Sequence, residues 1–283
     1  MISSLKDALP PLSITLAPTG MVPTYSMSAA VPLTPDEIIR DVLACAEIGV
    51  SAVHLHARDE NLRPTLAKEI YARIIGGIRE KCPDLVLCVS CSGRGSITLE
   101  QRLDVLNLQG DAKPDMASLT LASMNFSHDV SLNTTETVKT LAGKMRERGI
   151  RAELEIFDLG MVNMMHVLIR HELLSPPYYA NLLFGGIASA QPGFLEIGTI
   201  IAGLPEQTHY NLVGLGEAQM PLAAIAAVSA PGVRVGLEDN LWLAAGRKKI
   251  ATNMQLVEKV HELAAITGRA IMTPAQLRSK LDL

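Results

Sequence analysis

Short apolar runs rich in β-branched residues alternate with longer segments in which apolar residues recur every three or four positions. The first pattern is typical of buried strands and the second of amphipathic helices. Strands are therefore predicted at residues 12–17, 52–57, 85–90, 115–120, 152–157, 178–184, 209–215 and 233–237. The intervening helices are predicted at residues 35–48, 67–81, 99–108, 134–148, 161–173, 195–204, 220–229 and 253–267.

Local signals support the boundaries of this alternation. Thr34, Pro35 and Glu37 form the cap pattern of a helix start, and Gly49 and Gly149 stand where a helix C-terminal glycine is expected. Strands that alternate with helices imply parallel strands joined by crossovers. We therefore predict an α/β fold, a single (β/α)8 TIM barrel that forms one domain over residues 1–283, with a short C-terminal extension. A dinucleotide-binding sheet is disfavoured, because "PTGMVPT" and not a GxGxxG turn follows the first strand.

The composition narrows the classes of partner. Of the 283 residues, 48% are hydrophobic and 19% charged, which is enough to bury a large core. A net charge of −4 with interspersed signs, and only 4% aromatic residues, argue against a nucleic-acid partner. No apolar run approaches the roughly 18 residues of a membrane span, and the first twenty residues lack the pattern of a signal peptide. Four cysteines indicate a reduced compartment, so a cytoplasmic location is expected.

Two histidines two positions apart give the strongest chemical signal. In the predicted strand at 52–57, the side chains of His54 and His56 must point to the same face. Glu238 lies at the end of the last predicted strand, and active sites of such barrels gather at the carboxyl ends of the strands. Two histidines and a carboxylate bind Zn²⁺ in catalytic sites, although Fe(II) and other divalent ions accept the same ligands. The alternative is a pair of satisfied core histidines.

Further polar residues fall on other strand ends, where a core does not need them. They are Ser90, Ser118, Thr120, Glu153, Glu155, Arg234 and Asp239. Asp239, next to a candidate metal ligand and near Arg234, is a candidate general base, with a helix-cap or surface aspartate as the alternative. His128 and His209 lie near strand ends and are weaker candidates for the pocket.

Several segments resemble the β-keto acid cleavage enzymes, of which the 3-keto-5-aminohexanoate cleavage enzyme is the best-known member. They are "APTGMVPT", "VHLHARDENLRPT", "VSCSG", "SLTLASMNF", "FDLGM" and "VRVGLEDNLW", spread in order from about residue 15 to residue 273. The resemblance implies a (β/α)8 fold, a homotetramer and a divalent metal, normally zinc. It also implies that a small-molecule β-keto acid condenses with acetyl-CoA, the co-substrate, to give acetoacetate and a new acyl-CoA.

The resemblance also assigns roles to residues of this chain. The implied metal ligands are His54, His56 and Glu238, and the implied catalytic residues are Asp239 as base, Arg234 as its charged partner and Ser90. Ser90 and Gly93 align with substrate-binding positions, and the substrate-binding hydroxyl of the fourth strand falls on Ser118 or Thr120.

Two positions depart from the family pattern. The amine-substrate member carries an acidic residue where this chain has Val22, so a cationic 5-amino substrate would lose its ion pair here. Glu155 or Glu153 remains able to supply a pocket charge. Glu217 stands where many relatives carry a basic residue, which puts binding of the coenzyme A phosphates by that loop in doubt. The alternative function is that of a metal-dependent aldolase or an amidohydrolase-like hydrolase, although the latter carries its HxH pair on the first strand.

Overall fold

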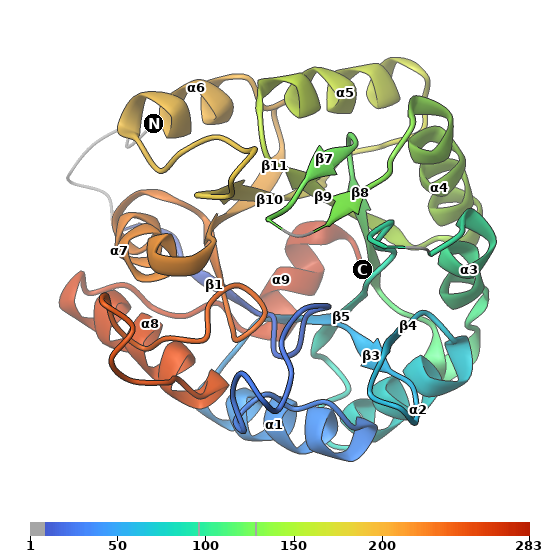
Figure 1. Cartoon of the computed structure of the whole chain (residues 1–283). Coiled ribbons are helices and arrows are strands. Elements are labelled where there is room, and N and C mark those ends of the chain that lie inside the picture. Colours follow the sequence, from blue (N-terminus) through green and yellow to red (C-terminus); the bar gives the residue numbers. More distant parts are fainter. Residues whose placement is uncertain (1–8, 96, 128) are drawn as a thin grey trace.

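Eight parallel strands close into a barrel in the computed structural model, which describes residues 9–95, 97–127 and 129–283 (Figure 1). Around the barrel the strands follow the order β1–β12–β11–β10–β9–β6–β5–β2. They are β1 (Ser13–Leu16), β2 (Ala52–Leu55), β5 (Val86–Val89), β6 (Met116–Thr120), β9 (Arg151–Ile156), β10 (Tyr178–Phe184), β11 (Thr208–Gly214) and β12 (Gly232–Val235). All eight predicted strands are present, and the predicted TIM barrel is confirmed.

Helices form a ring outside the barrel (Figure 1). They are α1 (Pro35–Ile48), α2 (Lys68–Arg79), α3 (Leu99–Asp104), α4 (Thr135–Arg148), α5 (Leu159–Arg170), α6 (Phe194–Ala202), α7 (Gln219–Ser229) and α8 (Asn253–Ile266). The Thr34 side chain accepts a hydrogen bond from the Glu37 backbone and completes the predicted capping box of α1. Short 3₁₀ turns, η1 (Val105–Asn107), η2 (Gly110–Ala112) and η3 (Gly216–Ala218), precede strand β6 and helix α7. Within the described residues, no helix is both long and apolar enough to cross a bilayer.

The sequence patterns missed three pieces of local structure. Two short antiparallel hairpins lie outside the barrel sheet: β3 (Ala57–Arg58) with β4 (Pro64–Thr65), and β7 (Met124–Asn125) with β8 (Val130–Ser131). The predicted C-terminal extension is a helix, α9 (Pro274–Leu281), which starts with a capping box of Thr273 and Gln276. Its Leu277 and Leu281 are fully buried against residues at the beginnings of the strands, and Figure 1 shows it across the barrel axis. Helix α9 therefore closes the amino-terminal end of the barrel.

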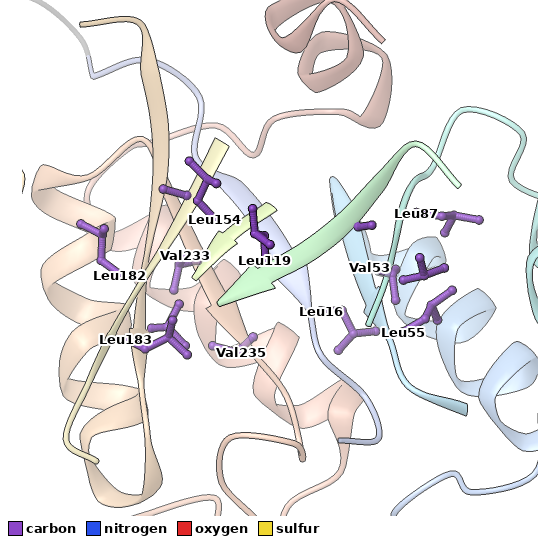
Figure 2. Close-up of a cluster of buried hydrophobic side chains, with 14 of the residues drawn as sticks. Leu16, Val53, Leu55, Leu87, Leu119, Leu154, Leu182, Leu183, Val233 and Val235 are labelled. Atoms are coloured by element: carbon purple, nitrogen blue, oxygen red, sulfur yellow. The ribbon is translucent and has the colours of Figure 1, made fainter. Parts of the chain in front are cut away.

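The hydrophobic core lies between the strands and the helical ring. Alternate strand residues, such as Leu16, Val53, Leu119 and Leu154, point outward into this layer and are almost completely buried (Figure 2). The intervening residues point into the barrel, and many of them are polar: Ser13, Thr15, His54, Ser118, Glu153, Asn181, Asn211 and Arg234. Burial of apolar side chains thus stabilises the outer layer, and the interior must satisfy its polar groups by hydrogen bonds.

A hydrogen-bonded network fills the lower part of the barrel interior, towards the end that helix α9 closes. The Asn211 amide donates to the Tyr179 hydroxyl at 2.7 Å and to the Asn181 carbonyl oxygen at 2.8 Å. The Tyr179 and Thr15 hydroxyls are 2.6 Å apart. These bonds compensate for the loss of water around the buried groups and fix the side chains of three strands, β1, β10 and β11.

His209 belongs to this network and not to the mouth of the barrel. It is buried near the start of β11, with its Nε2 atom 2.7 Å from the Ser13 hydroxyl. The weaker prediction that His209 serves the pocket is therefore wrong, because its side chain lies at the opposite end of the strand. His128 lies outside the described residues.

The buried imidazole of His209 predicts acid sensitivity of the fold. Burial, helped by the charges of Lys280 and Arg269, lowers its pKa from 6.5 to about 3. Between these values the unfolded chain binds the extra proton, so stability falls as the pH drops below about 6.5. From pH 7 to pH 5 the expected loss from this residue is about 2 kcal/mol of unfolding free energy.

Urea unfolding of the wild type and of His209→Gln at both pH values measures this loss. The variant keeps a neutral hydrogen-bonding group, so its decrease in stability over the same interval should be smaller by about 2 kcal/mol. His171→Gln, a change of an exposed histidine, is the matched control and should behave like the wild type. An equal pH dependence in all three proteins would contradict the prediction.

Candidate active site

A cavity of about 540 Å³ opens at the carboxyl ends of the strands. Nine of the eleven predicted site residues line it: Val22, His56, Ser90, Ser118, Thr120, Glu155, Arg234, Glu238 and Asp239. His54 lies beneath it on β2, with only 1% of its surface exposed. Gly93 lies in the wall behind it, where an added Cβ would come within 2.7 Å of both Arg102 Nη1 and the Leu132 carbonyl oxygen. The strand-end residues named from the sequence thus meet at one cavity.

Three of these side chains bring potential metal-binding atoms together. The Nε2 atoms of His54 and His56 are 3.2 Å apart, and Glu238 Oε1 lies 3.3 Å from His56 Nε2 and 3.9 Å from His54 Nε2. Ligands of a tetrahedral zinc at bond lengths near 2.0–2.1 Å are about 3.4 Å apart. In the described part of the chain, the buried Glu238 Oε2 atom has no hydrogen-bond partner. The donor set therefore fits a divalent metal with nitrogen and oxygen ligands.

Glu153 orients the first of these histidines. Its Oε2 atom is 2.5 Å from His54 Nδ1 and it is fully buried, whereas the sequence had offered it only as a pocket charge. Burial alone would lower the pKa of His54, but the Glu153 and Glu238 carboxylates raise it to about 9. The surroundings of His54 thus favour positive charge. A proton on Nδ1 that is held by Glu153 leaves Nε2 free for a metal cation, which meets the same electrostatic demand.

Arg234 joins the acidic groups of the cavity. Its guanidinium binds Asp239 through Nε at 2.9 Å and Nη2 at 3.0 Å, and its Nη2 lies 2.8 Å from Glu238 Oε1. Burial raises the pKa of Asp239 to about 6; Arg234 opposes this rise and Glu238 adds to it. A buried carboxylate with a raised pKa is a stronger base than an ordinary aspartate. The alternative of a surface or cap aspartate does not hold, because Asp239 is only 9% exposed.

The hydroxyl groups of the cavity differ in whether their protons are already used in a hydrogen bond. The Thr120 hydroxyl donates a hydrogen bond to Glu155 Oε2 at 2.5 Å. Ser118 accepts a hydrogen bond from the Cys91 backbone, and Ser90 accepts one from the Ser92 backbone. Since these two serines only accept hydrogen bonds from the residues that the structure describes, their hydroxyl protons can be donated to a ligand.

The loop after β1 is fixed against Glu238, one of the three candidate metal ligands. Gly20 has φ 68°, and an added Cβ would lie 2.7 Å from Glu238 Cγ, so a side chain there would displace the carboxylate. The buried Arg58 donates to the carbonyl oxygens of Gly20 and Pro23. Val22 stands between these anchors, 46% exposed, and lines the cavity.

Other parts of the cavity wall were missed by the sequence patterns. The hairpin β7–β8 contributes Phe126, and the Arg94 guanidinium lies 3.9 Å from the centre of its ring. Arg247 reaches the cavity from the loop after β12. These residues lie in loops, where strand alternation gives no information.

Comparison with known proteins identifies the family of this chain. The sequence profile of the beta-keto acid cleavage enzymes matches residues 11–283. The chain belongs to this family. It is 34% identical over 275 residues to the 3-keto-5-aminohexanoate cleavage enzyme of Acetoanaerobium sticklandii, which covers 96% of this chain and 98% of that protein.

A second relative and a solved structure extend the comparison. The 3-oxoadipate:acetyl-CoA acetyltransferase of Cupriavidus necator is 32% identical over 279 residues, or 96% of this chain and 95% of that protein. The apo structure of ObcA superposes with a TM-score of 0.79 over 90% of this chain and 66% of its own length. At 22% identity, that likeness concerns the fold alone.

The contact between Glu153 and His54 predicts an effect on metal affinity. Glu153→Gln weakens the hydrogen bond that fixes the imidazole, and loss of such a contact typically lowers metal affinity about 10–100-fold. Zinc titration against a chelating dye measures the change. Glu155→Gln, on the same face of β9 but bonded to Thr120, should keep the wild-type affinity. Equal affinities of the two variants would show that Glu153 does not position His54.

Proposed function

We propose that this protein is a metal-dependent β-keto acid cleavage enzyme. In this reaction a β-keto acid condenses with acetyl-CoA and yields acetoacetate and a new acyl-CoA. The observation that carries the proposal is the convergence of His56, Glu238 and an Arg234-bound Asp239 in one cavity, with His54 directly beneath them. Membership of the family supports it, as do the names of relatives that act on β-keto acids with acetyl-CoA.

We propose Zn²⁺ as the metal, held by His54, His56 and Glu238, with another divalent ion as the alternative. When bound, such an ion is a Lewis acid that polarises the keto group of the substrate and makes the protons on its C2 atom more acidic. A structural zinc normally has four protein ligands, whereas this donor set has three, the number that is typical of catalytic sites. The homotetramer and the cytoplasmic location remain predictions from the sequence.

The side chains around this centre account for the remaining steps. Because the Thr120 hydroxyl already donates a hydrogen bond to Glu155, we assign Ser118, of the two hydroxyls on β6, to substrate binding. Ser90 and Ser118 then donate hydrogen bonds to the substrate carboxylate. Asp239 accepts a proton from C2, which allows C2 to attack the thioester carbon of acetyl-CoA and expel the coenzyme A thiolate. The thiolate then attacks the former keto carbon, and the bond between that carbon and C2 breaks, which releases the new acyl-CoA. Asp239 returns its proton to C2 of the released acetoacetate, while Arg234 keeps the carboxylate in place throughout.

The carboxylates of the cavity already have partners, and this argues against a cationic substrate. Among the described lining residues they are Glu155, Glu238 and Asp239, and each already contacts a hydroxyl, an imidazole or Arg234. Val22 offers an apolar surface where an ammonium group would need an acid. We therefore propose a β-keto acid without a positive charge on its side group.

Acetoacetate production tests the proposed reaction. The zinc-loaded protein, given acetyl-CoA and a panel of β-keto acids, should form acetoacetate and a new acyl-CoA with at least one substrate. Asp239→Asn should lower turnover about 10²–10⁴-fold, because it removes the proton acceptor. Elemental analysis should find unchanged zinc in this variant. Hydrolysis without acetoacetate would favour an amidohydrolase-like enzyme, and full turnover by Asp239→Asn would exclude Asp239 as base.

The substrate preference has a separate test at Val22. Val22→Glu should lower KM for 3-keto-5-aminohexanoate about fivefold, because a partly exposed ion pair contributes up to about 1 kcal/mol. Val22→Gln has the same shape without the charge and serves as the control. If the glutamate and glutamine variants have the same KM for this substrate, residue 22 does not face the side group.

A further inference from the structure

The loop after β12 forms a basic hairpin at the rim of the cavity, comprising residues 241–251. Trp242 pairs with Ile250, and the backbone hydrogen bonds from Leu243 to Lys249 and from Ala251 to Leu241 hold its two sides together. Its tip carries three consecutive cations, Arg247, Lys248 and Lys249, all exposed. The hairpin is therefore an ordered element that concentrates positive charge.

The turn at its tip has an uncommon backbone. Gly246 has φ 79° and Arg247 has φ 53°, the left-handed region that residues other than glycine adopt at an energetic cost. Such a conformation persists where the surrounding structure imposes it, and it is frequent at ligand-binding positions. Here it carries the arginine that lines the cavity.

The position of Arg247 distinguishes it from the other cations of the cavity wall. Among the described lining residues these are Arg94, Arg234 and Arg247, with side chains 19%, 1% and 65% exposed. Arg94 packs on Phe126, and Arg234 is bound to Asp239 deep in the barrel. Arg247 therefore offers a guanidinium at the entrance and not at the reaction centre.

The acidic surroundings of the hairpin are sparse. Arg247 Nε lies 3.4 Å from Glu217 Oε1, an exposed pair of the kind that contributes little stability. Within the part of the chain that the structure describes, no carboxylate lies within 4.0 Å of the Lys248 or Lys249 ammonium group. The hairpin can thus receive an anion without breaking a buried interaction.

We infer that the basic hairpin binds the phosphate groups of coenzyme A. This inference rests on the proposed function, in which the thioester must reach Asp239 while the nucleotide stays outside the barrel. The pantetheine arm leads from the buried centre to the rim, where the phosphates meet the three cations. Arginine and lysine are the side chains that bind phosphate oxygens most strongly, and a phosphate group competes with Glu217 for Arg247.

The double variant Lys248→Ala/Lys249→Ala tests this site in the zinc-loaded enzyme. It should raise KM for acetyl-CoA and Kd for coenzyme A about fivefold, since two exposed charge contacts are lost. Its KM for the β-keto acid should not change. Its turnover of S-acetyl-N-acetylcysteamine, which carries the thioester without the phosphates, should also equal that of the wild type. The control Arg40→Ala/Arg170→Ala removes two exposed charges from the outer helices α1 and α5 and should behave like the wild type.

A change of opposite sign completes the test. Glu217→Gln removes the carboxylate that competes with phosphate and should lower Kd for coenzyme A about twofold. The inference is overturned if the double variant and its control bind coenzyme A equally, or if the double variant loses activity equally with the truncated thioester. Either result leaves the proposed function intact when the wild type still forms acetoacetate. A wild type that neither binds coenzyme A nor forms acetoacetate overturns both.

Discussion

The burial of one guanidinium inside the barrel constrains the whole reaction centre. Arg234 is 2% exposed, and a charge removed from water in this way costs several kcal/mol unless carboxylates compensate for it. Asp239 and Glu238 do so at 2.8–3.0 Å, and Glu155 approaches its Nη1 atom at 4.0 Å. Burial lowers the pKa of Arg234, but Asp239 and Glu238 together raise it well above its ordinary value. The proposed base Asp239, the proposed metal ligand Glu238 and the wall residue Glu155 are therefore all oriented by a single side chain.

The two faces of the strands differ in their side chains, and this difference allows the interior to be polar. The outward residues form the continuous apolar layer beneath the helices, and helix α9 seals the lower end of the barrel. The inward residues are then free to carry polar groups, provided that each finds a partner. In the Tyr179–Asn211 network below and the Arg234 cluster above, each side chain makes at least one hydrogen bond or ion pair. Individual atoms such as Arg234 Nη1 and Glu238 Oε2 have no hydrogen-bond partner among the described residues.

Strand alternation explains how much of the molecule could be predicted from its sequence. It gave the eight strands, the shared face of His54 and His56, and the placement of Glu238 and Asp239 at the mouth. It could not separate Glu153 from Glu155, because both share a face of β9. The register decides between them, since Glu153 lies beside Ser118, one layer deeper, whereas Glu155 lies beside Thr120.

The remaining errors have similar physical causes. Parity along β11 does not say at which end of the strand a histidine stands, and His209 proved to be at the bottom. Loops follow no hydrophobic period, so the hairpin β7–β8 and the packing of Gly93 against Arg102 escaped prediction. Helix α9 did carry a capping signal at Thr273, but its contact with strand residues more than 150 positions earlier is a tertiary property.

The anchored loop after β1 has a consequence for how such an enzyme diversifies. Gly20 and Pro23 are held by Arg58, so the backbone that crosses above Glu238 keeps its course whatever side chain stands at Val22. Under the proposed function, a single codon change at that position would alter which molecules enter without shifting the proposed metal ligands or the proposed base. Evolvability of this kind arises from rigidity, because the anchored loop backbone stays in place while the side chain at position 22 changes.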